Sequence, residues 1–583
     1  MKRFLSLSCI ISFIFLAGCG GNDNNSRATP SVASEHDLDI RETEPEDGMI
    51  RLYGHTGRGD KGVPVAGGSD MNGDGFVDFA MASMLASPEG RSGAGEVYLA
   101  LGNGEINYTL DSGLDNTNLL TIIGDGALEM TGSEIWMDDV TGDGVAELLI
   151  ARQNFNTDTE VGVGALSIII GSSALTTLAA NNEVVDLRDP PASINVLTIT
   201  GENELDRLGI WMRTGDITGD GILDIAVGAD QHDAQGSNSG VVYVVRGGAY
   251  LETSNTIALD EIAGSMLDGQ TAKLLPPNNS TNFHLGATVN IADLDGNGSA
   301  ELLAAATINR AGAGEDAFGA APGSAIANSG SPLGRAYIVW DDNFPDIWPT
   351  NFSITIEGGN IGAITDIQGA NTAAFNSDKL GEELLGGLDY DGDGSADIFI
   401  GDITGSPSGR SRAGLGYIFF NAAQLKGLDF NVGEIPAGIT FTVLYGTMSG
   451  AISSDTALHG DFDNDGIDDL AVSSPHDSAL GRPDAGTLHV LWGQSAWPSE
   501  IDLASSQQPA YEDFAITNIF GANGTVEDDL GDILAYSAAA GDIDNDGFTD
   551  LIVNEMVGNG SQPNSEDVGN LIAISGALLH FLK

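Results

Sequence analysis

The chain has 583 residues, and its 84 acidic and 22 basic residues give a net charge of −62 at pH 7. A charge of this sign and size repels nucleic acid and anionic lipid head groups, which excludes nucleic acid as a partner, and it attracts cations. Eighty glycines and few long apolar runs argue against a helical or membrane-embedded protein.

Residues 1–18 have the pattern of an export signal. A basic start (MKR) precedes an apolar run at residues 4–15, which is too short to span a bilayer. The run ends in LAGC at residues 16–19, which resembles the lipobox of bacterial lipoprotein signal peptides. The resemblance implies cleavage before Cys19, acylation of that residue and, because Gly20 follows, sorting to the outer membrane, on the cell surface or the periplasmic side. The alternative is an ordinary secretory signal followed by a chance cysteine.

Residues 19–48 are polar and show no apolar period, so we predict a flexible tether between the lipid and a folded body at residues 49–583. Cys9 leaves with the signal peptide, and the mature chain keeps Cys19 alone. No internal disulfide is therefore expected, so another kind of stabilising interaction must take the place of disulfides in this exported chain.

A nine-residue pattern recurs seven times, at intervals of 69, 77, 77, 96, 72 and 81 residues. Each copy has an acid at positions 1 and 9, Asp, Asn or Thr at position 3, Asp or Asn at position 5, and Gly at position 6. Seven intact copies indicate a repeated structural unit rather than chance. The copies, numbered here as loops 1 to 7, occupy residues 70–78, 139–147, 216–224, 293–301, 389–397, 461–469 and 542–550.

The spacing within each copy is typical of a calcium loop. Oxygens at positions 1, 3, 5 and 9 and the backbone carbonyl at position 7 can converge on one hard cation, because Gly at position 6 permits a tight turn. Ligands that are all oxygen favour Ca²⁺ over Zn²⁺ or Mg²⁺. We therefore expect about seven structural calcium ions. Their predicted ligands are Asp70, Asn72, Asp74, Phe76 and Asp78; Asp139, Thr141, Asp143, Val145 and Glu147; Asp216, Thr218, Asp220, Ile222 and Asp224; Asp293, Asp295, Asn297, Ser299 and Glu301; Asp389, Asp391, Asp393, Ser395 and Asp397; Asp461, Asp463, Asp465, Ile467 and Asp469; and Asp542, Asp544, Asp546, Phe548 and Asp550.

EF-hand loops begin in the same way, but they need a glutamate at position 12 and a helix after the loop. Position 12 is apolar in all seven copies, as at Met81 and Val472. Each loop is followed by a short apolar run such as DIAVGA, which indicates a strand buried on both faces. The EF-hand alternative is excluded.

Two further signatures follow each loop. A Gly-x-Φ-x-Φ segment, where Φ is mostly apolar, has the alternation of a strand. A later apolar segment ends in glycine. It is found at residues 120–124, 197–201, 354–358, 442–446 and 517–521, and the copy expected near 262–275 lacks a clear pattern. Each unit is then strand, calcium loop, strand, strand, strand. We predict an all-β fold, a seven-bladed β-propeller of four-stranded antiparallel blades. The Gly-x-Φ-x-Φ segments begin at Gly95, Gly164, Gly240, Gly334, Gly414, Gly486 and Gly569.

The last unit lacks a fourth strand, whereas residues 49–54 have the fourth-strand signature and no unit of their own. Pairing the two would complete the last blade, close the ring and remove an exposed sheet edge. We expect this closure.

The repeat resembles the FG-GAP repeat of integrin α-subunit propellers and of related bacterial envelope proteins. Its Phe-Gly dipeptide stands at Phe520-Gly521 and is replaced by Tyr-Gly at residues 53–54 and 445–446. The resemblance covers nearly all of residues 49–576 and implies that each calcium loop joins the first and second strands of a blade.

This strand order places the loops between second and third strands, and those between blades, on the face opposite the calcium loops. The longest such segments are expected at residues 311–331 and 359–376. In integrins the equivalent face meets ligand and partner subunit, so the resemblance implies a protein or glycan ligand there and a role in adhesion or surface recognition. A non-adhesive envelope scaffold is the alternative.

The eight histidines show no metal-ligand spacing, and neither a nucleophile elbow nor a phosphate-binding loop is found. We therefore expect a binding protein rather than an enzyme. A hydrolase acting on lipid or polysaccharide is the less favoured alternative.

Overall fold

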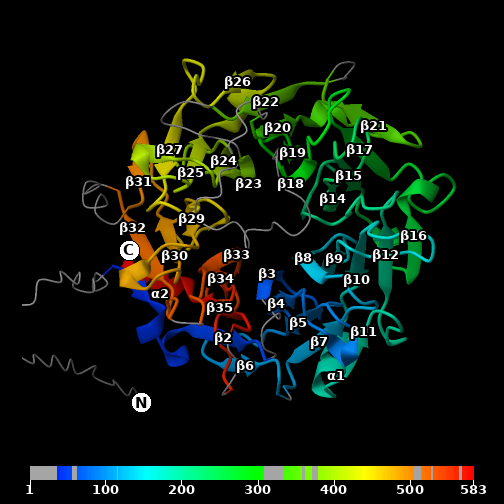
Figure 1. The fold of residues 1–583 in the computed structure, drawn as a ribbon, viewed down its shortest axis with the longest axis horizontal. Helices are drawn as coiled ribbons and strands as arrows, with labels where there is room; N and C mark the ends of the chain where they lie inside the picture. The colour runs from blue at the N-terminus through cyan, green and yellow to red at the C-terminus, as the bar shows by residue number, and fades with distance from the viewer. Residues whose placement is uncertain are drawn as a thin grey trace, which may run out of the picture.

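The computed structural model of the chain forms seven small sheets around a common axis (Figure 1). It describes residues 36–55, 62–114, 116–306, 333–357, 362–370, 379–504, 514–526, 529–562 and 567–583. The predicted all-β, seven-bladed propeller is confirmed. The predicted signal peptide, Cys19 and the loop at 311–331 lie outside the described residues. None of the described helices is long and apolar enough to cross a membrane.

The first strand of each blade lies nearest the axis, and the second strand pairs with it in antiparallel register (Figure 1). Every second strand begins at the position-9 acid of its repeated loop and is buried along its whole length, as expected for a strand covered on both faces. The first strands are β3 (Gly62–Ser69), β8 (Thr131–Asp138), β13 (Met212–Gly215), β18 (Leu285–Ala292), β23 (Leu380–Leu388), β28 (Ala457–Gly460) and β33 (Leu534–Gly541). The second strands are β4 (Asp78–Ser83), β9 (Glu147–Arg152), β14 (Asp224–Ala229), β19 (Glu301–Ala306), β24 (Asp397–Asp402), β29 (Asp469–Ser474) and β34 (Asp550–Glu555).

The third strands begin directly after the glycines of the Gly-x-Φ-x-Φ segments, as predicted, and the fourth strands pair with them in antiparallel register. The third strands are β5 (Glu96–Ala100), β10 (Ala165–Ile169), β15 (Val241–Val245), β20 (Arg335–Val339), β25 (Leu415–Phe419), β30 (Thr487–Leu491) and β35 (Asn570–Ile574). The fourth strands are β7 (Leu119–Ile123), β12 (Val196–Thr200), β17 (Thr271–Leu275), β22 (Ile364–Gln368), β27 (Phe441–Tyr445), β32 (Ile516–Phe520) and β2 (Met49–Tyr53).

The predicted number of strands in a blade is wrong, because each sheet has five. The fifth strand comes from outside the blade and runs parallel to the fourth, so it covers the outer edge of the sheet. These strands have two to four residues, which is too short for an alternating pattern to be read from sequence. They are β11 (Val184–Asp186), β16 (Asn255–Ala258), β21 (Phe352–Thr355), β26 (Asp429–Asn431), β31 (Glu500–Asp502), β1 (Leu38–Asp39) and β6 (Thr109–Asp111).

In three blades, an arginine in the loop between the second and third strands forms an ion pair with an aspartate of the fifth strand. Arg91 donates both terminal nitrogens to Asp186 on β11, each at 2.9 Å. Arg410 pairs with Asp502 on β31 at 2.9 Å, and Arg482 pairs with Asp39 on β1 at the same distance. Each fifth strand directly precedes the fourth strand of the next blade along the chain, so these ion pairs also tie neighbouring blades together.

Blade 4 departs from the sequence prediction. The predicted fourth strand at 354–358 overlaps β21 (352–355), which is the fifth strand of blade 3. The fourth strand of blade 4 is β22, inside the segment 359–376 that we assigned to a loop. Gly369 after β22 donates its N–H to the carbonyl of Gly334 at 2.9 Å, as Gly521 does to Gly486 at 3.0 Å. The polar Thr, Asp and Gln of β22 hide its strand pattern.

The ring closes as predicted, because β2 pairs with β35 over five residue pairs. Gly54 donates its N–H to the carbonyl of Gly569 at 3.0 Å, and a Cβ on Gly54 would lie 2.4 Å from that carbonyl oxygen, so glycine is required at this position. The folded body begins earlier than predicted, since β1 within the predicted tether pairs with β32 of blade 6. Two short helices, α1 (Ala174–Ala180) and α2 (Gly576–Leu582), follow the third strands of blades 2 and 7.

Candidate metal centres

All seven repeated loops adopt the same tight turn. The glycine at position 6 has φ between 84° and 93°, a left-handed conformation that other residues rarely adopt. Its N–H donates to the position-1 aspartate at 2.7–3.0 Å in every loop. The N–H of position 7 donates to the side chain at position 5 at 2.8–3.1 Å. The turn therefore gathers the predicted oxygen donors on one side.

The acid at position 9 is at most 1% exposed in every loop. In six loops it accepts the N–H of position 2 at 2.7–3.0 Å, and in loop 3 Asp224 accepts the N–H of Thr218 at 3.1 Å. These hydrogen bonds fix the carboxylate at the start of the second strand and close the loop on itself.

A second backbone donor to this acid was missed by sequence reasoning. It lies seven residues after the glycine that precedes each third strand, and the N–H of Gly102, for example, donates to Asp78 at 2.7 Å. Equivalent bonds of 2.7–2.9 Å come from Gly247, Asn421, Gly493 and Gly576. The signal was present in the sequence as a glycine that recurs at this distance in five of the seven units.

Burial raises the pKa of all seven position-9 acids, and repulsion by the other acids of the same loop adds to the effect. Each loop thus brings carboxylates together where their charges are costly at neutral pH, and a cation would relieve that cost. The pKa rises to about 7 for Asp78, Asp224, Asp397 and Asp550, and to about 8 for Glu147, Glu301 and Asp469.

Four loops bring three carboxylates within 4.8 Å of one another, among the residues that the structure describes. They are loops 4 to 7, and all four have aspartate at position 3. Loops 1 to 3 have Asn72, Thr141 and Thr218 there, and these side chains donate hydrogen bonds to a neighbouring loop aspartate at 3.1–3.4 Å. The donor set is oxygen throughout, as a hard cation requires.

Comparison with known protein families decides the identity of the repeat. The family model of the FG-GAP repeat matches residues 209–245, 455–491 and 534–568. These three segments are FG-GAP repeats. The matched segments start at or close to the first strands of blades 3, 6 and 7 and include loops 3, 6 and 7. No curated protein matches the chain.

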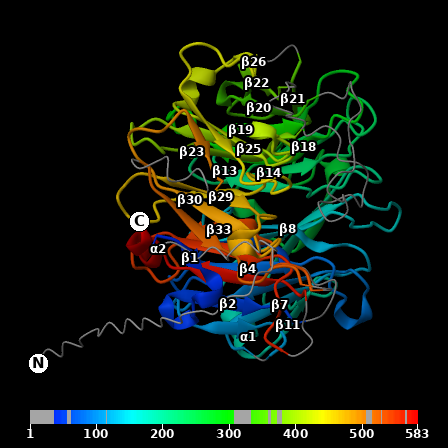
Figure 2. The ribbon, with the colours of Figure 1, turned by 60° about the vertical axis from the view of Figure 1, so that its left-hand side comes forward.

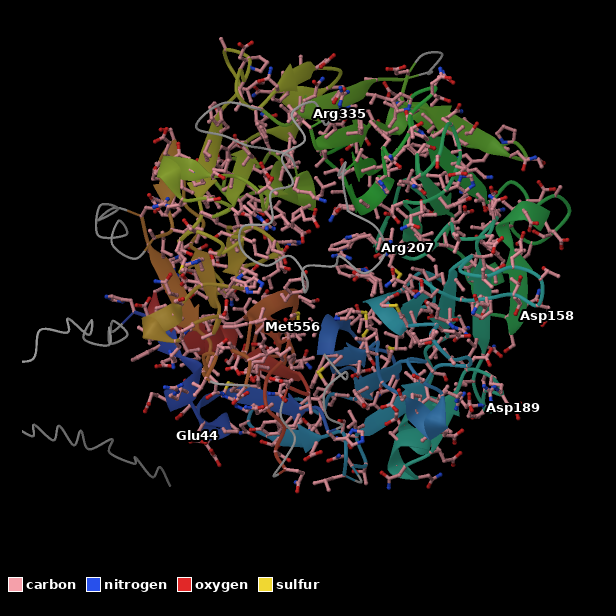
Figure 3. The ribbon with its side chains drawn as sticks, viewed as in Figure 1. Glu44, Asp158, Asp189, Arg207, Arg335 and Met556 are labelled. Carbon is pink, nitrogen blue, oxygen red and sulfur yellow. The ribbon has the colours of Figure 1, made fainter. Side chains whose placement is uncertain are left out.

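The face of this FG-GAP propeller opposite the metal loops carries exposed apolar side chains. Of the eleven large hydrophobic side chains that are exposed in the described residues, seven lie in loops between second and third strands or between blades. Four more apolar residues near the axis form a buried cluster beneath this face, which includes Met84 and Met556, and Figure 3 shows Met556 toward the centre of the ring. The seven exposed residues are Leu85, Leu128, Val161, Leu205, Met448, Val526 and Leu530.

A chain of hydrogen bonds in blade 6 of the FG-GAP propeller has the order of a nucleophile, a base and an orienting amide. Ser474 Oγ lies 3.0 Å from His489 Nε2, and His489 Nδ1 lies 2.7 Å from Asn518 Oδ1. Ser474 is fully buried and its Oγ also lies 2.6 Å from Ser453 Oγ, so a substrate carbonyl has no room beside it. These residues tie the strands of blade 6 together.

Proposed function

We propose that this chain is a calcium-stabilised, integrin-like propeller of the cell envelope that binds a protein ligand. It would be held at the outer membrane by lipid on Cys19, and the ligand would bind to the face opposite the calcium loops. The seven exposed apolar side chains on that face, out of eleven in the described residues, support this proposal most directly.

Calcium is proposed as the resident cation of all seven loops. The side-chain oxygens at positions 1, 3, 5 and 9 would hold it, together with the carbonyl at position 7. When bound, the ion supplies a fixed positive charge that neutralises buried carboxylates and locks the turn between the first and second strands. The role of each loop is then structural, in place of the internal disulfides that a mature chain with Cys19 alone could not form.

A glycan ligand and a purely structural role in the envelope are the competing functions. A glycan site would favour aromatic rings at the surface, whereas the exposed large hydrophobic side chains of this face in the described residues include no aromatic ring. We therefore favour a protein ligand, and we expect binding without chemical conversion.

Substitution of one exposed leucine tests the binding face. Leu205 and Leu114 are both 58% exposed, but Leu205 lies between blades 2 and 3 on the proposed face, and Leu114 lies in the connection between the third and fourth strands of blade 1. We expect Leu205→Ser to weaken retention of residues 36–583 on arrayed envelope and extracellular proteins by about tenfold, because burying the exposed part of this leucine contributes about 1.4 kcal/mol.

Leu114→Ser is the matched control and is expected to bind like the unsubstituted protein. Equal binding by both variants would contradict the assignment of the face. Retention on a glycan array alone would favour the glycan alternative.

A further inference from the structure

The lysine that follows α2 enters one of the metal loops. Lys583 Nζ donates to Asp463 Oδ2 and, at 3.0 Å, to Asp465 Oδ2. These aspartates occupy positions 3 and 5 of loop 6, and with Asp461 they form one of the four carboxylate clusters. The ammonium group is therefore bound by the oxygens that a calcium ion would use.

The fold holds this lysine in place. Gly576 at the start of α2 donates its N–H to Asp550 of loop 7 at 2.9 Å, and Leu579 is fully buried against blade 6. Lys583 Nζ also lies 5.2 Å from the centre of the Trp492 ring, which adds a cation–π contact. The seven-residue helix thus spans from loop 7 to loop 6, at the rim of the ring beside β1 (Figure 2).

Loop 7 provides a comparison within the same chain. Loops 6 and 7 have the same residues at positions 1, 3, 5 and 9, all aspartate. No lysine or arginine pairs with the acids of loop 7, or with those of loop 5, in the described part of the chain, whereas Lys583 pairs with two acids of loop 6. The difference between the loops lies in the tethered cation and not in the ligands.

The arrangement recurs once at another blade. Lys426 follows a short helical turn after the third strand of blade 5 and places its Nζ 3.6 Å from Asp295 Oδ2 in loop 4. It also lies 5.0 Å from the centre of the Trp340 ring. In both cases a lysine from the blade that follows reaches the loop of the preceding blade, beside a tryptophan after its third strand.

We propose that Lys583 is a built-in counter-cation that competes with calcium for loop 6. A calcium ion and the ammonium group would repel each other strongly at these aspartate oxygens, so calcium binding is opposed until the ammonium group is displaced. Loop 6 is then the weakest calcium site of the acidic loops 5 to 7, and its filling releases the end of α2. This inference rests on the proposed calcium role of the loops.

Calcium titration of the chelator-treated protein tests the competition. We expect Lys583→Gln to tighten one site by about tenfold relative to the unsubstituted protein, whereas Lys583→Arg keeps the competing charge and leaves that site weak. Arg188→Gln is the matched control, because it removes one positive charge at an exposed position whose ion-pair partner, Asp125, lies outside all the loops. Asp463→Ala, introduced into Lys583→Gln, removes the ligand oxygen at position 3 and should abolish the tightened site, which identifies it as loop 6.

Hydrogen exchange of residues 576–583 provides a second readout. We expect exchange there to increase as calcium fills loop 6, and to be raised without calcium in Lys583→Gln. Superimposed titrations of the unsubstituted protein and Lys583→Gln, or unchanged exchange in α2, would overturn the role of Lys583. Failure of all seven loops to bind calcium would instead overturn the proposed calcium role itself.

Discussion

Calcium is expected to raise the melting temperature of residues 36–583 at about pH 8 by roughly 10 °C over the chelated protein. At ten times its dissociation constant each site contributes about 1.4 kcal/mol, so seven sites together contribute about 10 kcal/mol. An unfolding entropy of roughly 2 cal/mol/K per residue converts this into the stated shift for a chain of this length. Differential scanning calorimetry with and without chelator measures the effect.

The chelated protein should also be more stable at about pH 5 than at pH 8. The position-9 acids have a pKa near 7 or 8 in the folded state, well above their values near 4 when unfolded. As the pH rises through this window the unfolded state loses its protons first, so folding stability is lost. With calcium present, the protein should instead be more stable at pH 8 than at pH 5. Identical melts with chelator and with calcium, at both pH values, would show that the loops need no cation.

Removal of residues 36–54 is expected to abolish cooperative melting. This segment supplies the fourth strand of blade 7 and the fifth strand of blade 6. Ile40, Ile50 and Leu52 are fully buried, and burying each contributes about 2 kcal/mol, which together approaches the net stability of a whole domain. Circular dichroism melts of residues 55–583 and 36–583 measure the difference.

The chain that begins at residue 36 is the control for this deletion and should melt like the longer protein. A synthetic peptide of residues 36–54, added in excess, should restore the cooperative melt because it refills both edges. A melt of residues 55–583 that coincides with that of residues 36–583 would show that the ring does not depend on this closure.

Repetition made most of the fold predictable. The seven loops fixed the number of blades, and the fourth-strand pattern at residues 49–54 located the closure, because each feature could be compared with six others. What repetition could not reveal were segments too short or too polar to carry a pattern. The fifth strands have at most four residues, and β22 contains Thr, Asp and Gln where an apolar alternation was sought.

The metal loops were predicted more completely than their surroundings. Ligand spacing is local, so every predicted acid lies in its expected turn. The backbone N–H of Gly102 that holds Asp78, and the approach of Lys583 to loop 6, join residues that are 24 and 120 positions apart. Such contacts depend on the packing of strands and blades, which sequence spacing does not determine.

Metal analysis of the folded chain tests most directly whether the repeated loops bind cations that stabilise the propeller. Residues 36–583 can be equilibrated with about 10 mM calcium, well above the range of extracellular calcium modules, and the bound metal counted by native mass spectrometry. We expect seven calcium ions per chain. Three or fewer ions per chain would contradict the assignment of the loops as structural calcium sites.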